Sequence, residues 1–455
     1  MAIQVSPKRY DVDMTTGSVV RHLLSFSLPY LLGSLFQQFY NLVDTWVVGN
    51  YVSSAAFSAV GTTSPVIFML IGFFNGLAGG INIVISQYYG AKKYDSVKRA
   101  VHTVVLMILL ICALFTVVGI CMTPAMLHLM NTPAEVLDQA ADYLRIYFAG
   151  VSGLILYNTF AGILRATGNT CQPLYALIVA SVLNVGLDLL LVLKFRMGIR
   201  GVAYATIVSQ AVSALVLLVL LLRTASCVRL QSSALHLDRE MLGKILKIGL
   251  PSALQISLTS FSNVFVQAYI NGLGTYVMAG WTIFIKAESV FLLPIQSVVL
   301  SLSTFTGQNL GVGNVARIRQ GRRIALGLLL ACIGVLIVVV CAFAPQIVAF
   351  FNKDPDVISA GAIYLRWICP FYLVHSIGQI HIAVLQGAGN TKLTMGVLLF
   401  SYVVTRQIYL YLVANFISYT AVPVALGYPA GWIMAALLAT FFYYRTDLTK
   451  TRLTS

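Results

Sequence analysis

Long apolar runs, separated by short polar or Gly/Pro-containing breaks, fill the chain from about residue 20 to about residue 445. A helix needs about 20 apolar residues to cross a bilayer, and every run reaches that length. Several runs exceed about 25 residues, which predicts tilted or kinked helices. We therefore expect an all-α integral membrane protein with twelve transmembrane helices. The predicted spans are 22–48, 56–88, 100–124, 139–164, 173–193, 201–222, 248–272, 276–305, 324–347, 357–385, 393–415 and 422–443.

The second half of the chain repeats the first. The segment ILRATGNT (163–170) matches VLQGAGNT (384–391), and SQYYGAKKYDSVKRA (86–100) matches GQNLGVGNVARIRQG (307–321), both at an offset of 221 residues. Pro29 aligns with Pro251 at an offset of 222 residues. Each half holds six spans, so both halves enter the membrane in the same direction. Such parallel repeats are expected to form two six-helix lobes related by a pseudo-two-fold axis along the membrane normal.

Lysine and arginine predict the orientation. In this topology 21 of the 29 basic residues lie on the side of the two termini and 4 lie in the loops on the other side. Because cytoplasmic loops carry the excess of basic residues, we expect both termini to be cytoplasmic. The predicted domains are a cytoplasmic tail (1–21), an N-lobe (22–222), a cytoplasmic inter-lobe loop (223–247), a C-lobe (248–443) and a second cytoplasmic tail (444–455).

Composition narrows the class of protein. Hydrophobic residues make up 59% of the chain and charged residues 9%, against roughly 25% charged residues in a soluble domain. The net charge of +15 follows from the basic loops, and no soluble basic domain is present to bind nucleic acid. No nucleic-acid partner is expected.

Two carboxylates lie inside the predicted spans of the first half. In ASVLNVGLDLLLVL (180–193), Asn184 and Asp188 are four residues apart, so they share one helix face. A charged side chain at membrane depth is costly and usually functional. The first span carries the other carboxylate, Asp44, within a polar stripe. The other members of that stripe are Gln37, Tyr40 and Asn41.

The depth of these residues in their spans predicts that they meet. Asp44 and Asp188 each fall in the outer third of a span that runs outward. Thr206 lies one to two turns into the sixth span, which returns from the outer side. We therefore expect Asp44, Asn184, Asp188 and Thr206, with Tyr40 beside them, to form one cation-coupling site.

The repeat supplies an internal control for this site. A carboxylate kept only for folding would be expected in both halves. The aligned positions of the second half instead hold Tyr409 for Asp188, Thr405 for Asn184 and Val266 for Asp44. The acidic chemistry is therefore predicted in the first lobe alone.

This set of residues is compatible with two kinds of site, one that binds a metal cation and one that carries a proton. Oxygen ligands alone suit a small hard cation, so Na⁺ is a candidate at Asp44, Asn184, Asp188 and Thr206. Alternatively, two neighbouring carboxylates in a low dielectric do not both ionise readily, so the pair can carry a proton. The sequence does not separate H⁺ from Na⁺, and no other cofactor or metal is predicted.

Further polar and charged residues lie inside the predicted spans. Gln37, Asn41, Lys286 and His375 are candidates to line a substrate cleft, although His375 also suits a hydrogen-bonded structural role. Arg406 is expected to tie helices together through backbone carbonyl oxygens rather than to bind substrate. The stretch GFFNGLAGGINI (72–83) has small residues at helical spacing, which predicts close helix packing.

These residues resemble the bacterial multidrug and toxic compound extrusion (MATE) transporters. The resemblance rests on LPYLLGSLFQQFYNLVDTWVVG, GILRATGNT and NVGLDLLL followed by GVAYATIVSQ, and it runs from about residue 20 to about 445. It implies a twelve-helix antiporter that exports cationic or amphipathic compounds against inward Na⁺ or H⁺.

The resemblance also implies site residues. The first-lobe cation site of the family falls on Asp44, Asn184, Asp188 and Thr206, and Pro29 matches a proline implicated in bending of the first helix. Some members carry a second-lobe acidic site, but here those positions are Thr259 and His375. Coupling is therefore expected in the first lobe.

The predicted function is secondary active multidrug efflux, not enzymatic catalysis. No Walker-type loop is present, so an ion gradient is the expected energy source. The alternative is a flippase for a lipid-linked or other amphipathic substrate, which would favour a more cationic cleft. An intramembrane aspartyl enzyme would need a Gly-x-Gly-Asp signature, which is lacking. The expected partners are small organic cations or amphipathic drugs and membrane lipid, and the protein is expected to be a monomer.

Overall fold

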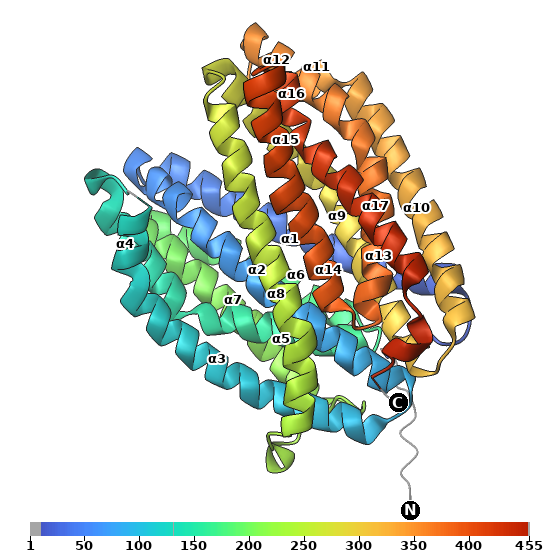
Figure 1. Ribbon diagram of the computed structural model, residues 1–455. Helices are drawn as coiled ribbons and strands as arrows, with labels where there is room; N and C mark the ends of the chain where they lie inside the picture. Colours follow the sequence, from blue (N-terminus) through green and yellow to red (C-terminus); the bar gives the residue numbers. More distant parts are fainter. Residues whose placement is uncertain (1–10, 131, 454–455) are drawn as a thin grey trace, which may run out of the picture. The chain divides into compact units, whose positions relative to one another are not determined.

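The computed structural model describes residues 11–130 and 132–453, and all regular secondary structure in these ranges is helical (Figure 1). Residues 1–10 of the predicted N-terminal tail and 454–455 of the predicted C-terminal tail lie outside the described residues. The first half contains α1 Val19–Tyr51, α2 Ser54–Gly90, α3 Tyr94–Leu129, α4 Ala134–Ala149, α5 Val151–Ala166, α6 Cys171–Asp188, the π-helical turn η1 Leu189–Lys194 and α7 Gly198–Arg223.

The second half follows the same order after a connecting loop that holds the short 3₁₀ turn η2 Ser232–Ala234. Four of its predicted spans are divided into shorter helical pieces. Its elements are α8 Arg239–Asn271, α9 Thr275–Gly311, α10 Val315–Ala342, α11 Ala344–Phe351, α12 Pro355–Ile368, η3 Cys369–Phe371, α13 Tyr372–Gly387, α14 Thr391–Leu399, η4 Phe400–Thr405, α15 Arg406–Leu412, η5 Val413–Ile417, α16 Ala421–Ala425, α17 Gly427–Arg445 and η6 Leu448–Thr451.

The predicted spans correspond to these helices. Among the described residues ten segments are long and apolar enough to cross a membrane, and the bent pair α4–α5 makes an eleventh. The remaining predicted span, 248–272, lies in α8 except for its last residue, and the 33 residues of α8 would reach about 50 Å at 1.5 Å per residue. The fold is thus the predicted all-α membrane fold of twelve helical spans.

The fourth span differs in detail from the sequence expectation. It was expected as one helix over 139–164, but α4 and α5 meet at Gly150 with a bend of 44°. A side chain at Gly150 would lie 2.3 Å from the Cβ of Ile207 in α7. The glycine therefore lets the bent segment pack closely against α7, a contact that an apolar pattern does not reveal.

The helices pack in two compact units. Of the described residues, the first unit contains 11–13 and 28–253, and the second contains 14–27 and 254–453. The division falls inside two helices, between Ser27 and Leu28 in α1 and between Ala253 and Leu254 in α8. Each division lies within two residues of a proline, Pro29 or Pro251. The lobe limits drawn from the sequence, 22–222 and 248–443, stay predictions.

The two units repeat one packing scheme. In the first, α2 packs against α3, α4 and α5, and α5 packs against α7. In the second, α9 packs against α10, α12 and α13, and α13 packs against α17. Each pair in one unit is the repeat equivalent of a pair in the other. The internal repeat predicted from short matching segments is therefore confirmed as a repeat of helix packing.

Large apolar side chains cover the outward faces of several spans. Leu110 and Val117 in α3, and Val335 and Val338 in α10, are each more than 60% exposed. Apolar surface of this extent is characteristic of a face in contact with lipid.

Candidate cation site

Three helices of the first unit bring the predicted coupling residues together. α1 supplies Asp44, α6 supplies Asn184 and Asp188 at its C-terminal end, and α7 supplies Thr206. Asn184 and Asp188 share a face because they are four residues apart in a regular helix. Asn184 is 1% exposed and Asp188 is fully buried.

The carboxyl group of Asp44 is the centre of this cluster. Its side chain interacts with those of Asp188, Thr206 and Asn184. The Thr206 hydroxyl lies 3.4 Å from Asp44 Oδ2, to which it can donate, and 3.0 Å from the carbonyl oxygen of Val202 one turn earlier. The sequence placed these four residues at one depth, and the structure places them in contact.

Several buried polar atoms of the cluster lack a hydrogen-bond partner among the described residues. Asp44 Oδ1, both carboxylate oxygens of Asp188 and both amide atoms of Asn184 are buried and make no hydrogen bond of good geometry among the described residues. Two carboxyl groups that face each other cannot satisfy one another while both are ionised, because each then offers only acceptors. A proton or a cation between them would supply the missing partner.

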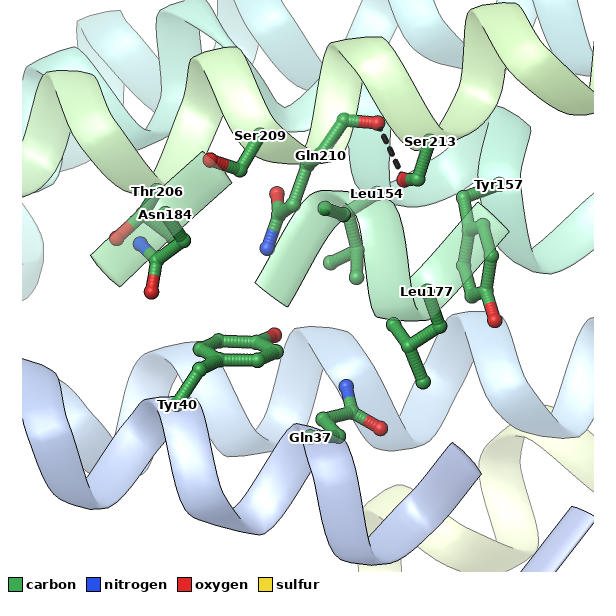
Figure 2. A pocket seen from close by; sticks show the side chains of 11 residues that line it. Gln37, Tyr40, Leu154, Tyr157, Leu177, Asn184, Thr206, Ser209, Gln210 and Ser213 are labelled. Carbon is green, nitrogen blue, oxygen red and sulfur yellow. Dashed lines mark hydrogen bonds between the residues drawn. The ribbon is translucent and has the colours of Figure 1, made fainter. Parts of the chain in front are cut away.

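A small cavity extends from this cluster along α1. Its volume is about 20 Å³, enough for about one water molecule. Figure 2 shows Tyr40 and Gln37 of α1 projecting towards Asn184, Leu154 and Gln210 across the cavity. Asn184, Tyr40 and Gln37 line it, whereas Asp44 and Asp188 do not.

Sequence reasoning missed part of this lining. Ser209, Gln210 and Ser213 of α7 line the cavity beside Thr206, and Ser213 donates a hydrogen bond to the backbone oxygen of Gln210 at 2.7 Å (Figure 2). The signal was present, because positions 206, 209/210 and 213 follow helical spacing. The buried Tyr157 of α5 also lines the cavity, but no pattern in its own helix pointed to it.

Aromatic residues of α4 close the cluster on another side. Tyr143 and Tyr147 are buried, and Tyr143 is an electrostatic neighbour of both Asp44 and Asp188. The Tyr147 hydroxyl makes no hydrogen bond among the described residues. Tyr143 therefore places a phenol near both carboxylates.

The other residues singled out in the first half lie along α1. Pro29 is inside the helix, eight residues before Gln37. Gln37 and Tyr40 line the cavity, and Asn41, although half-buried, does not. The predicted stripe on α1 is therefore only partly directed into the cavity.

The candidate residues of the second half belong to the second unit. Lys286 is exposed and lies 5.6 Å from the ring centre of Phe351. His375 is buried, 3.3 Å from the Tyr402 hydroxyl, and its ring contacts Trp432. These surroundings describe a packed histidine, and neither residue lines the cavity of the first unit.

Arg406 ties helices together in an unexpected way. Backbone carbonyl oxygens were the expected partners of this buried guanidinium. Instead its Nη1 donates to the side-chain oxygen of Asn263 at 2.7 Å, and its planar group lies 4.4 Å from the ring centre of Tyr428 and 5.2 Å from that of Tyr402. The sequence pattern did not reveal this aromatic enclosure.

The positions equivalent to the carboxylates hold no acid in the second unit. Val266, the equivalent of Asp44, is fully buried, and the Tyr409 hydroxyl, the equivalent of Asp188, donates to the backbone oxygen of Pro423 at 3.1 Å. The same backbone scheme therefore folds without acids at these positions.

Comparison with known proteins agrees with the repeat. The MatE family profile matches the chain twice, over residues 29–190 and 251–412, an offset of 222 residues. The chain is 29% identical over 433 residues to the probable multidrug resistance protein YoeA of Bacillus subtilis (strain 168), covering 94% of each chain. It is 24% identical over 378 residues to the multidrug export protein MepA of Staphylococcus saprophyticus, covering 83% of each.

Solved structures show the same fold. One of them is the outward-facing conformation of a multidrug resistance MATE family transporter of the MOP superfamily. It superimposes with a TM-score of 0.90 at 23% identity, covering 97% of this chain and 98% of that chain. The two units, their helix order and the helices that carry Asp44 and Asp188 therefore belong to a fold shared over nearly the whole chain.

Proposed function

This chain is a member of the MatE family of multidrug and toxic compound extrusion transporters, and from that premise we propose that it is a cation-coupled multidrug antiporter. It exports cationic or amphipathic compounds in exchange for H⁺ or Na⁺ across a bacterial inner membrane, with both termini in the cytoplasm. YoeA and MepA carry names that describe multidrug resistance and multidrug export, which supports this class of substrate.

One observation supports cation coupling in the first unit more than any other. Asp44 and Asp188 lie together with Asn184 and Thr206, and five of their buried polar atoms have no hydrogen-bond partner among the described residues. Leaving a buried carboxylate without a partner costs several kcal/mol. A bound proton or hard cation offsets that cost, so the site gains stability when it is loaded.

Coupling requires that the loaded and unloaded site favour different conformations. α1 offers a place for such a change, because Pro29 has no amide hydrogen to donate to the carbonyl oxygen of Ser25 one turn earlier. The helix bends more easily there than elsewhere. Loading at Asp44, four turns further along α1, would change the contacts between α1 and α6/α7 and so bias this bend.

Drug resistance in cells tests the proposal. Asp44→Asn and Asp188→Asn should each abolish resistance in a host strain that lacks its own exporters, at unchanged amounts of protein in the membrane. Asp142→Asn is the matched control, because Asp142 forms an exposed ion pair with Arg200 at 2.7 Å and should keep resistance. Full resistance in both Asp44→Asn and Asp188→Asn would show that coupling does not depend on this site.

The identity of the ion is settled by reconstitution. In proteoliposomes without Na⁺, drug transport driven by a pH gradient would identify H⁺ as the coupling ion. Transport that needs a Na⁺ gradient and is indifferent to the pH gradient would identify Na⁺. Both outcomes are compatible with the proposed cation site. Transport that neither ion gradient drives would contradict antiport.

A further inference from the structure

A second cavity lies in the first unit, next to the one described above. It is bounded by α1, α2, α5 and α6, and its volume is about 40 Å³. Gln37, Tyr157 and Leu177 line both cavities. We call this second space the arginine cavity, because Arg165 is the sole charged residue among the described residues that line it.

Arg165 forms no ion pair with another described residue. Its guanidinium lies 4.8 Å from the ring centre of Tyr30, and its Nε is buried without a hydrogen-bond partner. A cation–π contact satisfies the flat face of a guanidinium, and the side chain of Tyr157 also interacts with that of Arg165. Both partners are neutral, so neither balances the charge of Arg165, and its Nε–H still needs an acceptor.

Further donors converge on the same space. Thr170 is 3% exposed, lines the cavity and has a hydroxyl with no hydrogen-bond partner among the described residues. It is also the residue that precedes α6, and it does not cap that helix through its side chain. Asn158 lines the cavity too, and among the described residues its amide donates to the Leu154 backbone oxygen at 3.0 Å, which uses one of its two N–H groups. The positive end of the α6 dipole adds to this potential.

The repeat indicates that the fold does not require this charge. The position equivalent to Arg165 in the second unit is Gln386, whose amide donates to the side-chain oxygen of Gln255 at 3.3 Å. A neutral residue with a hydrogen-bond partner in the protein is therefore enough for this helix to fold at the equivalent position. The first unit keeps a positive charge that has no acidic partner among the described residues.

From this convergence we propose that the arginine cavity binds a small inorganic anion of halide size, held by the Arg165 guanidinium, the Thr170 hydroxyl and the Asn158 amide. The volume admits about three water molecules, or a chloride ion with a water, and is far below the 300–1,000 Å³ of a typical drug pocket. A cation is disfavoured because no carboxylate is among the described residues that line the space. Waters alone would satisfy the donors but would leave the charge of Arg165 unbalanced.

Thermal unfolding of the purified full-length protein tests this site. The melting temperature is measured in sodium chloride, sodium bromide and sodium gluconate at equal concentrations, so that ionic strength and Na⁺ are matched. A ligand that binds only the folded state raises the melting temperature with concentration. Chloride and bromide should therefore raise it above gluconate in a saturable manner.

Variants separate specific binding from general salt effects. Arg165→Gln should give the same melting temperature in all three salts. Arg445→Gln should keep the full halide response, because Arg445 also lies over an aromatic ring, Phe441 at 5.3 Å, but is exposed. Asp188→Asn should keep the response as well, which distinguishes failure of the anion site from failure of the cation site. A halide response of wild-type size in Arg165→Gln would overturn the proposal.

A direct measurement covers the case in which Arg165→Gln does not fold. Anomalous diffraction from wild-type crystals grown in bromide should show a peak between Arg165 and Thr170, and Thr170→Val should raise the half-maximal halide concentration severalfold. No peak in the arginine cavity, together with equal melting temperatures of the wild type in halide and gluconate, would show that the cavity holds only water.

Discussion

At the scale of single residues, the central feature is a pair of carboxylates with a hydroxyl and an amide around them. Asp44 and Asp188 could be predicted from the sequence because a charge inside an apolar span is exceptional and the repeat lacks it. Tyr143 and Arg165 could not, since their roles depend on which helices pack together. An aromatic residue or a terminal arginine in a span is too common to point to a site by itself.

Replacing Thr206 tests the geometry of that pair. Thr206→Val keeps the shape but removes the hydroxyl that lies 3.4 Å from Asp44 Oδ2. A hydrogen bond to a charged group is worth about 1.5–3 kcal/mol, so the ion concentration for half-maximal export should change about tenfold or more. With Na⁺ as the coupling ion, a ligand is lost and more Na⁺ is needed. With H⁺, the donor to the carboxylate is lost and less acid is needed.

Thr206→Ser is the control for this prediction, because it restores the hydroxyl and should behave as the wild type. The half-maximal ion concentration is measured from initial rates of drug transport in proteoliposomes. An unchanged value in Thr206→Val would mean that the hydroxyl does not contact the loaded carboxylate.

At the scale of helices, the apolar runs gave the spans but not their internal breaks. The bend at Gly150 and the 3₁₀ turn at Cys369–Phe371, which contains Pro370, lie inside runs that stay apolar throughout. A hydropathy pattern does not detect these breaks, because the backbone changes direction while the residues stay apolar. The π-helical turn that follows Asp188 has a counterpart, η5, near the same place in the second repeat. It is therefore a feature of the fold rather than of the cation site.

The glycines of α2 give a prediction about helix packing. Close packing was expected from 72–83, and it is confirmed for Gly76 and Gly80, which face α8, but not for Gly79. A Cβ at Gly76 would lie 2.6 Å from Ala253 Cα, whereas one at Gly79 would meet nothing within 4 Å. Gly76→Ala should therefore lower the free energy of unfolding by about 1–3 kcal/mol through overpacking.

Gly79→Ala is the matched control on the same helix. It should leave stability unchanged or raise it by up to about 1 kcal/mol, since alanine favours a helix more than glycine does. Both variants are compared by thermal unfolding in detergent. Equal melting temperatures for Gly76→Ala and Gly79→Ala would contradict the close approach of α2 and α8.

The start of α8 gives a prediction about pH. The Asp238 carboxylate caps this helix by accepting the backbone N–H groups of Met241 at 3.1 Å and Glu240 at 2.9 Å, and Arg99 donates to it at 3.2 Å. The hydrogen bonds from Met241 and Glu240, with the Arg99 charge, hold the pKa of Asp238 below its usual range. The stabilisation is therefore present above the unfolded pKa of about 4 and is lost as the pH falls through the lower folded value.

Asp238→Ala should lower stability at pH 7 by about 1 kcal/mol, the usual value of a helix cap, with a smaller difference from the wild type in strong acid. Asp238→Asn keeps the cap and should lose less. The melting temperatures of the three proteins between pH 7 and pH 3 check this. A difference between wild type and Asp238→Ala that stays constant over this range would contradict an ionised cap.

At the scale of the whole molecule, two units of one origin have diverged in chemistry. The MatE profile matches each half and the helix pairs repeat, yet the clustered intramembrane aspartates occur in the first unit. The second unit keeps a different acid, Glu288, whose Oε1 accepts a hydrogen bond from the Tyr372 hydroxyl at 3.0 Å. The repeated helix packing forms the fold, and the acidic residues found in one copy form the proposed coupling site.

The measurement that tests this account most directly compares Asp188→Asn with Glu288→Gln in proteoliposomes. Each substitution neutralises one intramembrane acid, and the measured quantity is the H⁺ or Na⁺ movement evoked by adding drug. We expect Asp188→Asn to abolish this ion movement and Glu288→Gln to retain it. Drug-evoked ion movement that persists in Asp188→Asn and disappears in Glu288→Gln would contradict coupling in the first unit.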